Sequence, residues 1–368
     1  MNTSPYPNSS ARLAPIQEIA RTELAGLVRS IDEKAQYPEN ILKALGQAGS
    51  FNIGPTVPTG ETSLSWNIEC MATISEQCLS TAFCMWCQNA LRWYLFTSEN
   101  RQLEETLGSQ IATGDLLGGT ALSNPMKHLA GIEVLKFHAR RTQGGYIVNG
   151  TVPWVSNLGP GHYFAAVFAL EENEAHKAMA IISCDQDGVV LSELNKFIAL
   201  NGTRTYSIHL KEVFVRDHQV IAEPAKPYIE RIRSGFILLQ TGVAIGLIRN
   251  TIQTMLKSRD SHGHVNKFLT MQPESVTEEL HTLEQCVHRL AKTPFETTPA
   301  YFSEVLTVRL GLADLAVASA NAALLHEGAR GYLQSSHADR RLREALFIAI
   351  LTPATKHLRK LLAGLQSP

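Results

Sequence analysis

Residues 144–157 read Gly-Gly-Tyr-Ile-Val-Asn-Gly-Thr-Val-Pro-Trp-Val-Ser-Asn. Two glycines followed by alternating strand-type residues predict a tight turn and the returning arm of a β-hairpin. Trp154 and Ser156 are two residues apart and therefore lie on one face of an extended strand. An indole and a hydroxyl placed in this way can cover a planar ring and bind its edge. A tryptophan packed in the core of a β domain is the simpler alternative.

Similar strand-like runs lie on both sides of this hairpin. They are separated by turn residues and cover 134–142, 162–170, 178–184 and 205–215. Alternating apolar and polar positions in such runs are typical of strands with one buried face. We therefore predict a mostly antiparallel β domain over residues 114–221.

Helical patterns flank this domain. Residues 1–113 have apolar positions at helical spacing, and so do four long stretches of the C-terminal part, at 231–259, 275–291, 301–329 and 338–365. The predicted class is α+β, with three parts: an N-terminal α-helical domain (1–113), a central antiparallel β-barrel or sandwich domain (114–221) and a C-terminal four-helix bundle (222–368).

The composition excludes several classes of function. The 368 residues include 33 Lys and Arg and 34 Asp and Glu, so the formal net charge is −1. A nearly neutral chain has no broad basic field for nucleic acid or for an anionic membrane, and we expect neither partner. Charged residues make up 18% of the chain, against about 25% in a typical soluble domain, which favours surface burial in an oligomer.

The sequence also indicates a compartment. Residues 1–11 are polar and have no basic start followed by an apolar run, so we expect no secretory signal. The longest apolar stretch, 235–248, is too short to span a bilayer. Six cysteines are too few for a disulfide framework in a chain of this length. We therefore expect a cytoplasmic protein.

Several groups of reactive residues have two interpretations. The Cys84–Cys87 pair lies in an apolar helical pattern without a second pair, so buried thiols are favoured over zinc ligands. No carboxylate-rich metal-binding motif accompanies His262 and His264, so a polar loop is favoured and we expect no metal site. The basic run that contains Arg340, Arg341, Arg343, Lys356, Arg359 and Lys360 is either a solvated helix face or a contact to a phosphate-bearing ligand. No Gly-x-Gly-x-x-Gly, P-loop or Gly-x-Ser-x-Gly motif is present.

Taken together, six segments in order resemble the acyl-CoA dehydrogenase superfamily of flavoproteins. Residues 32–49 are similar to the N-terminal helix of that family, and residues 120–125 (Thr-Ala-Leu-Ser-Asn-Pro) to the strand that begins its β domain. The hairpin quoted above resembles its "GGyxlnGxKxWisN" motif. The remaining matches are the segments 202–215, 328–332 (Gly-Ala-Arg-Gly-Tyr) and 343–345 (Arg-Glu-Ala).

The resemblance implies FAD bound between the β domain and the bundle, in a homodimer or homotetramer. It also implies an acyl thioester substrate, carried by CoA or by a carrier protein, and an acceptor protein or oxygen as the electron acceptor. Leu122 and Ser123 would lie along the flavin ring, Trp154 would cover one face of it, and Ser156 would bind its edge. Arg259 would reach the FAD phosphates of a neighbouring subunit, and Gly328 would lie near the adenosine half.

The sequence departs from the family at the catalytic base. The usual glutamate position falls at Thr352, no acidic residue follows Glu344, and none lies between Ser234 and Arg259, where some members carry the base instead. Three functions remain open: an acyl thioester oxidoreductase with a non-standard base, a flavin monooxygenase on the same fold, and a non-catalytic flavin or acyl-thioester binding protein. For the monooxygenase, the candidate histidines are His128, His262, His326 and His357. The sequence therefore leaves the catalytic residues unknown.

Overall fold

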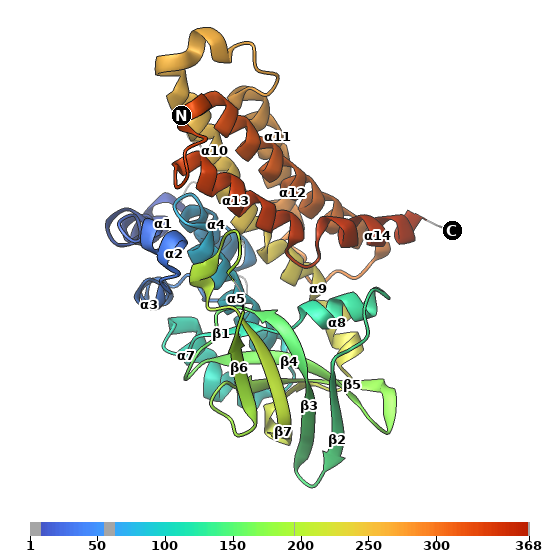
Figure 1. Ribbon diagram of the computed structural model, residues 1–368. Helices are drawn as coiled ribbons and strands as arrows, with labels where there is room; N and C mark the ends of the chain where they lie inside the picture. Colours follow the sequence, from blue (N-terminus) through green and yellow to red (C-terminus); the bar gives the residue numbers. More distant parts are fainter. Residues whose placement is uncertain (1–8, 55–62, 195, 367–368) are drawn as a thin grey trace.

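The computed structural model describes residues 9–54, 63–194 and 196–366. Residues 1–8 of the polar N-terminal segment, for which we expect no secretory signal, lie outside these ranges. The order of elements is helices, then strands, then helices, as the sequence predicts, and the class is α+β (Figure 1).

The N-terminal part is helical. Its central helix, α5 (Leu79–Thr97), is buried at every position from Leu79 to Leu95, and most of these residues are apolar. Cys84 and Cys87 lie on this helix as buried free thiols, so the buried-thiol interpretation is confirmed. The other elements are α1 (Ser9–Ile19), α2 (Val28–Lys34), α3 (Glu39–Gln47), α4 (Ser63–Ser75), α6 (Arg101–Leu103) and α7 (Ser109–Thr113), with π-helical turns at Ala20–Leu24 and Glu104–Gly108.

The central part is one eight-stranded sheet with the order β6-β7-β3-β2-β4-β5-β8, and β1 pairs with β4. Most neighbours are antiparallel, as predicted, but β1–β4 and β2–β4 are parallel. Its strands are β1 (Gly118–Thr120), β2 (Phe137–Thr142), β3 (Gly145–Val155), β4 (Tyr163–Leu170), β5 (Asn173–Ser183), β6 (Val189–Glu193), β7 (Tyr206–Arg216) and β8 (Val220–Ala222).

One predicted strand is wrong. Residues 120–125 resemble a strand, but β1 ends at Thr120 and a helix, α8 (Ser123–Leu129), takes over. The Thr120 hydroxyl accepts the backbone N–H of Leu122 at 3.1 Å and so supports this turn. Pro125 lies in the first helical turn, where its missing N–H costs little.

Two predicted helices are each divided in two. The stretch 231–259 belongs to α9 (Ala225–Leu239) and α10 (Thr241–Asn266), which are separated by Gln240. The stretch 338–365 becomes α13 (His337–Ile350) and α14 (Thr355–Gln366), because Pro353 cannot continue a helix. The other bundle helices are α11 (Pro273–Leu290) and α12 (Pro299–Glu327).

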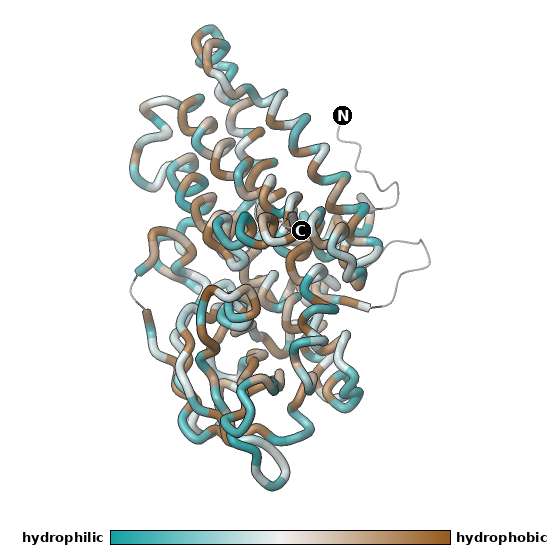
Figure 2. Tube along the Cα trace, turned by 90° about the vertical axis from the view of Figure 1, so that its right-hand side faces the viewer, coloured by the Kyte–Doolittle hydropathy of each residue, from teal (hydrophilic) through white to brown (hydrophobic). Residues whose placement is uncertain are grey.

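Helices α10 to α13 run side by side above the sheet, and α8 and α14 lie at the junction between them (Figure 1). Apolar and polar positions alternate along the helices of the bundle, in keeping with a shared core (Figure 2). Two helical stretches, Ala225–Asn266 and Pro299–Arg330, are long and apolar enough to cross a membrane by composition. Because 89% of the apolar window of the first is buried inside the protein, packing within the bundle accounts for its hydrophobicity.

Candidate functional site at the junction of sheet and bundle

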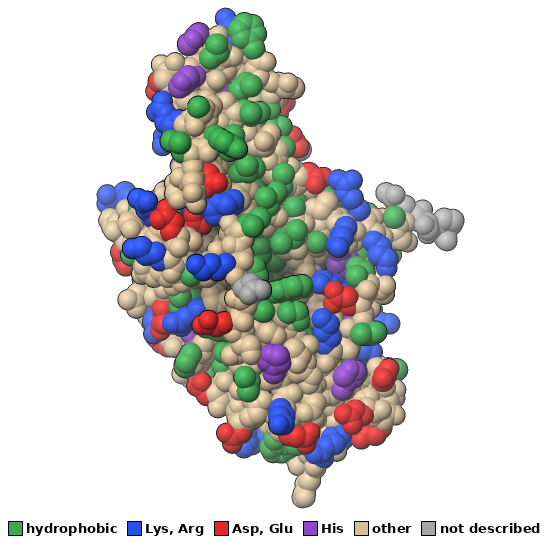
Figure 3. All heavy atoms as spheres, viewed as in Figure 1, with side chains coloured by type: hydrophobic (Ala, Val, Ile, Leu, Met, Phe, Trp, Pro, Cys, Tyr) green, Lys and Arg blue, Asp and Glu red, His purple; other side chains and the backbone are tan. Residues whose placement is uncertain are grey.

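A shallow hollow lies where α8 and the segment after it fold over β3. Its lining combines hydroxyl, amide and charged groups with one large aromatic ring. The lining residues are Thr120, Ala121, Ser123, Asn124, Lys127, Glu133, Lys136, Val152, Pro153, Trp154 and Val155. Hydrophobic side chains run down the bundle to a recess between the bundle and the sheet (Figure 3).

A pair of hydroxyls joins this hollow to the bundle. The Ser123 Oγ, at the start of α8, lies 2.8 Å from the Oγ1 of Thr352, in the turn between α13 and α14. Leu122 is fully buried directly before Ser123. The two residues are 229 positions apart, so only the tertiary fold places the predicted flavin contact beside the predicted base position.

The Thr352 turn is fixed from beneath by buried polar groups. The amide nitrogen of Gln240 donates to the Thr352 carbonyl at 2.8 Å, and the Gln240 amide oxygen accepts from Arg309 Nε at 3.0 Å. Arg309 also donates to the Ile348 carbonyl at 3.0 Å, and its side chain is 1% exposed. Burial lowers the pKa of the Arg309 guanidinium to about 10. The break between α9 and α10 thus presents Gln240 to the turn that carries Thr352.

Trp154 and Ser156 lie at the end of β3. Trp154 has a positive φ of 61°, an unfavourable backbone conformation for a bulky residue. Its side chain is 60% exposed and the Lys127 ammonium lies 5.8 Å from the ring centroid. Ser156 is 6% exposed, and its Oγ lies 2.6 Å from Thr205 Oγ1. The exposed indole contradicts the interpretation of Trp154 as a core residue.

Glu133 is a member of the site that the sequence did not indicate. It lies in the hollow, where Lys127 Nζ pairs with it at 2.9 Å and the Asn124 amide donates to it at 3.2 Å. Partial burial raises its pKa, but these two partners lower the pKa overall. No spacing pattern in the sequence links Glu133 to Ser123 or Trp154.

The remaining predicted site residues lie elsewhere. Arg259, near the end of α10, pairs with Glu274 at 2.5 Å, at the start of α11. Gly328 ends α12 with a positive φ of 63°. The Asn266 amide donates to the His326 carbonyl at 2.9 Å, which ties these helix ends together. The structure thus groups Leu122, Ser123, Trp154 and Ser156 at the junction, and places Arg259 and Gly328 at the far end of the bundle.

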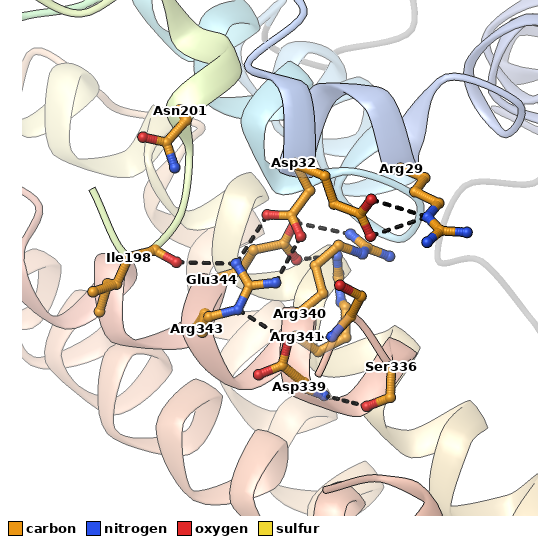
Figure 4. Close-up of polar contacts among 12 residues, drawn as sticks. Arg29, Asp32, Ile198, Asn201, Ser336, Asp339, Arg340, Arg341, Arg343 and Glu344 are labelled. Atoms are coloured by element: carbon orange, nitrogen blue, oxygen red, sulfur yellow. Dashed lines mark hydrogen bonds and ion pairs between the residues drawn. The ribbon is translucent and has the colours of Figure 1, made fainter. Parts of the chain in front are cut away.

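The basic run of α13 is neither a solvated face nor a free phosphate site. Arg340 and Arg341 pair with Glu344 at 2.8 Å and 2.5 Å, and all three side chains are buried. Arg343 binds Asp32 of α2 at 2.6 Å and also donates to the Ile198 carbonyl (Figure 4). These arginines hold α13 against the N-terminal helices, so both predicted interpretations are wrong for them.

No group of three or more His, Cys, Asp or Glu side chains suited to a metal ion occurs in the described ranges. The Nε2–H of His326 donates to the Met271 carbonyl at 2.9 Å. His357 is 3% exposed, and within the described part of the chain neither of its ring nitrogens has a hydrogen-bond partner. Burial, together with Lys127 and Lys360, lowers its pKa to about 4, so the imidazole is neutral at pH 7.

Comparison with known proteins places this geometry in context. No family model matches the chain. The structure of glutaryl-coenzyme A dehydrogenase with glutaryl-CoA is similar to it, with a TM-score of 0.86 and 13% identity over 99% of this chain and 96% of that one. The FAD complex of PigA has a TM-score of 0.82 and 14% identity, and covers 100% of both chains. These likenesses establish the fold.

Two curated relatives match almost end to end in sequence. Probable acyl-CoA dehydrogenase YngJ of Bacillus subtilis (strain 168) is 21% identical over 356 residues, 91% of each protein. Benzylmalonyl-CoA dehydrogenase of Aromatoleum aromaticum (strain DSM 19018 / LMG 30748 / EbN1) is 20% identical over 339 residues, 89% of each. The chain is similar over nearly its whole length to members of the acyl-CoA dehydrogenase superfamily.

The chain departs at the junction from the pattern that the superfamily resemblance implies. Thr352, the position that the resemblance assigns to the base, presents a hydroxyl toward Ser123. Glu344 is the last acidic residue of the chain, and its carboxylate forms ion pairs with Arg340 and Arg341. Among the described residues that line the hollow, Glu133 is the one carboxylate.

Proposed function

We propose that this protein is an FAD-dependent oxidoreductase that acts on an acyl thioester. One observation carries the proposal: the Ser123–Thr352 hydroxyl pair, 2.8 Å apart, joins the bundle to the edge of the sheet where Trp154 is exposed. The superfamily relatives named above include acyl-CoA dehydrogenases and a protein in complex with FAD.

The residues at the junction fit a flavin. A flavin ring is planar, apolar on its faces and polar along its edges. The Trp154 indole offers an exposed aromatic face, and the Ser123 hydroxyl, which lines the same hollow, offers a polar partner. A strained backbone at an exposed aromatic residue is more common at ligand sites than elsewhere. When bound there, FAD would supply the hydride acceptor.

We propose Glu133 as the base. Removing an α-proton from an acyl thioester requires a carboxylate or a neutral imidazole within reach. Glu133 lies in the hollow, and its lowered pKa keeps it ionised at neutral pH. Lys127 holds its Oε1, and Asn124 holds its Oε2, so the side chain is oriented while still partly exposed. Thr352 then serves to fix the start of α8 through Ser123.

The first test is spectroscopic. The purified protein is expected to be yellow, and an acyl-CoA added without oxygen is expected to bleach the flavin spectrum. Glu133→Gln should retain the flavin and bleach about 100-fold more slowly or worse. Glu212→Gln is the matched control, because Glu212, like Glu133, is bonded to a basic side chain and an asparagine of the same domain, here Arg140 and Asn149, but lies outside the hollow. Wild-type bleaching in Glu133→Gln would exclude Glu133 as the base, and a colourless protein would exclude the function.

A flavin monooxygenase is the second candidate, and the hydroxyl at Thr352 together with the neutral imidazole of His357 favours it. In that case acyl-CoA does not bleach the flavin, and added reduced flavin with substrate consumes oxygen rapidly. A binding protein without activity would retain flavin and show neither response.

We also propose that the protein acts as a cytoplasmic homo-oligomer. The bundle carries a set of exposed apolar side chains, and such surfaces in soluble proteins commonly lie in protein–protein contacts. They are Val265, Phe268, Leu325, Tyr332, Leu333, Leu346 and Ile350. Light scattering on the purified protein tests this directly, and a monomeric mass would refute it.

A further inference from the structure

The second part of the basic run near the C-terminus is exposed. Lys356, Arg359 and Lys360 lie on α14, three and four residues apart, and are therefore neighbours on one face of that helix. All three are exposed to solvent. No acidic residue occurs in α14 or anywhere after Glu344. The helix therefore presents a basic face without carboxylates of its own.

This basic face continues across α8 to the hollow. Lys360 Nζ donates to the Ala130 carbonyl, directly after the last residue of α8. Lys127 of α8 and Lys136 of the following segment line the hollow itself. Lys127 and Lys360 both lower the pKa of the buried His357 imidazole, so their ammonium groups lie close to the same ring. Lys and Arg side chains accordingly gather over α8 and α14 (Figure 3).

Apolar side chains are exposed within this basic surface. Leu129, Ile132 and Val134 are 37%, 40% and 77% exposed, and Trp154 in the hollow is 60% exposed. Exposed apolar side chains with a polar rim are typical of surfaces that bind another protein. The surface therefore offers both charge and apolar contact to a partner at the opening of the hollow.

The cations are held apart and do not meet at one point. Lys360 bonds to the end of α8, whereas Arg359 pairs with Asp314 of α12 at 3.1 Å. A phosphate group is bound by donors that converge on it, such as the N–H groups of a backbone nest or an arginine fork. Separated charges around apolar side chains instead suit the spaced carboxylates of a protein surface. Because Glu133 and Asp314 are the carboxylates that pair with these cations, positive charge remains for an acidic partner.

We propose that this surface, formed by α14 and residues 127–136, binds an acidic carrier protein that bears the acyl thioester on a flexible arm. The proposal rests on the function proposed above and specifies the carrier of its substrate. The carrier protein binds to the basic face of α14, and its apolar contacts lie on residues 129–134. Its arm enters the hollow beside Trp154, because a flexible thioester arm reaches a recess that the carrier protein itself cannot enter.

The test presents one acyl group on two carriers, butyryl-CoA and an acidic bacterial acyl carrier protein loaded with butyryl. Lys356→Glu and Lys360→Glu each reverse one charge of the surface, and each should weaken binding of the carrier protein by about five- to tenfold. Lys211→Glu is the matched control, because Lys211 is an exposed lysine of β7 outside the hollow. The butyryl-CoA concentration that gives half-maximal flavin bleaching should change by less than about twofold in all three variants.

Binding is measured by fluorescence anisotropy of the labelled carrier protein, which requires no flavin, and circular dichroism checks that each variant is folded. The proposal is overturned if the wild type does not bind the carrier protein, or if Lys211→Glu weakens binding equally. An equal loss of butyryl-CoA binding in Lys356→Glu would instead make the surface a nucleotide phosphate site. A smaller oligomer of Lys356→Glu in light scattering would show that a second copy covers the surface, and either result also overturns the proposal. A protein that binds the carrier protein but holds no flavin overturns the proposed function alone.

Discussion

Glu344→Gln is the substitution that best separates a structural carboxylate from a catalytic one. Glu344 is 2% exposed and pairs with both Arg340 and Arg341, whose side chains are 10% and 1% exposed. Arg341 also donates to the Ser75 carbonyl at 2.6 Å. The cluster therefore joins α13 to the N-terminal helices and already has one positive charge in excess.

The magnitude follows from burial. Removing one partner of a buried ion pair typically costs about 3–5 kcal/mol, because it leaves an uncompensated charge. In Glu344→Gln two guanidinium groups lose their counterion, so we expect the free energy of unfolding to fall by about 4 kcal/mol. Asp339→Asn is the control. Asp339 is 28% exposed and bonds Arg343 at 3.1 Å, and such a pair is worth about 1 kcal/mol or less.

The assay is urea unfolding followed by far-UV circular dichroism at pH 7, with flavin reduction measured on the same folded samples. We expect a large loss of stability in Glu344→Gln, with the activity of each folded, flavin-loaded molecule close to that of the wild type. A variant as stable as the wild type that has lost activity would refute the structural role and would make Glu344 the base.

Further predictions concern the junction. The folded-state pKa of His357, about 4, is below the ordinary value of 6.5, so the unfolded chain takes up the proton first as pH falls. Stability should therefore drop by about 2–3 kcal/mol between pH 7 and pH 4.5. In urea titrations at both pH values, His357→Leu should lack this part of the loss, and an identical loss in both proteins would contradict the assignment. Thr352→Glu places a carboxylate opposite Ser123 and should speed anaerobic bleaching by acyl-CoA by about 100-fold or more. No gain in a folded, flavin-loaded variant would show that position 352 is not where the substrate proton lies.

Much of the fold follows from local sequence. Helical periodicity predicted the helical parts on both sides of the sheet, and the turn at Gly144 and Gly145 predicted the central hairpin, because these signals depend on neighbours a few residues apart. The breaks within the long helices had weaker signals. Pro353 could have indicated one of them, whereas nothing local marks Gln240 as the end of α9.

The candidate site, like the fold, could be predicted from the sequence only in part. The sequence by itself determined the superfamily resemblance and the absence of acidic residues after Glu344 and between Ser234 and Arg259, because these are facts of order and composition. Only the tertiary structure placed Thr352 beside Ser123, 229 residues away, and Glu133 in the same hollow as Trp154. It also buried the α13 arginines against Glu344. Contacts between distant segments depend on how whole elements pack, and no short stretch of sequence encodes that packing.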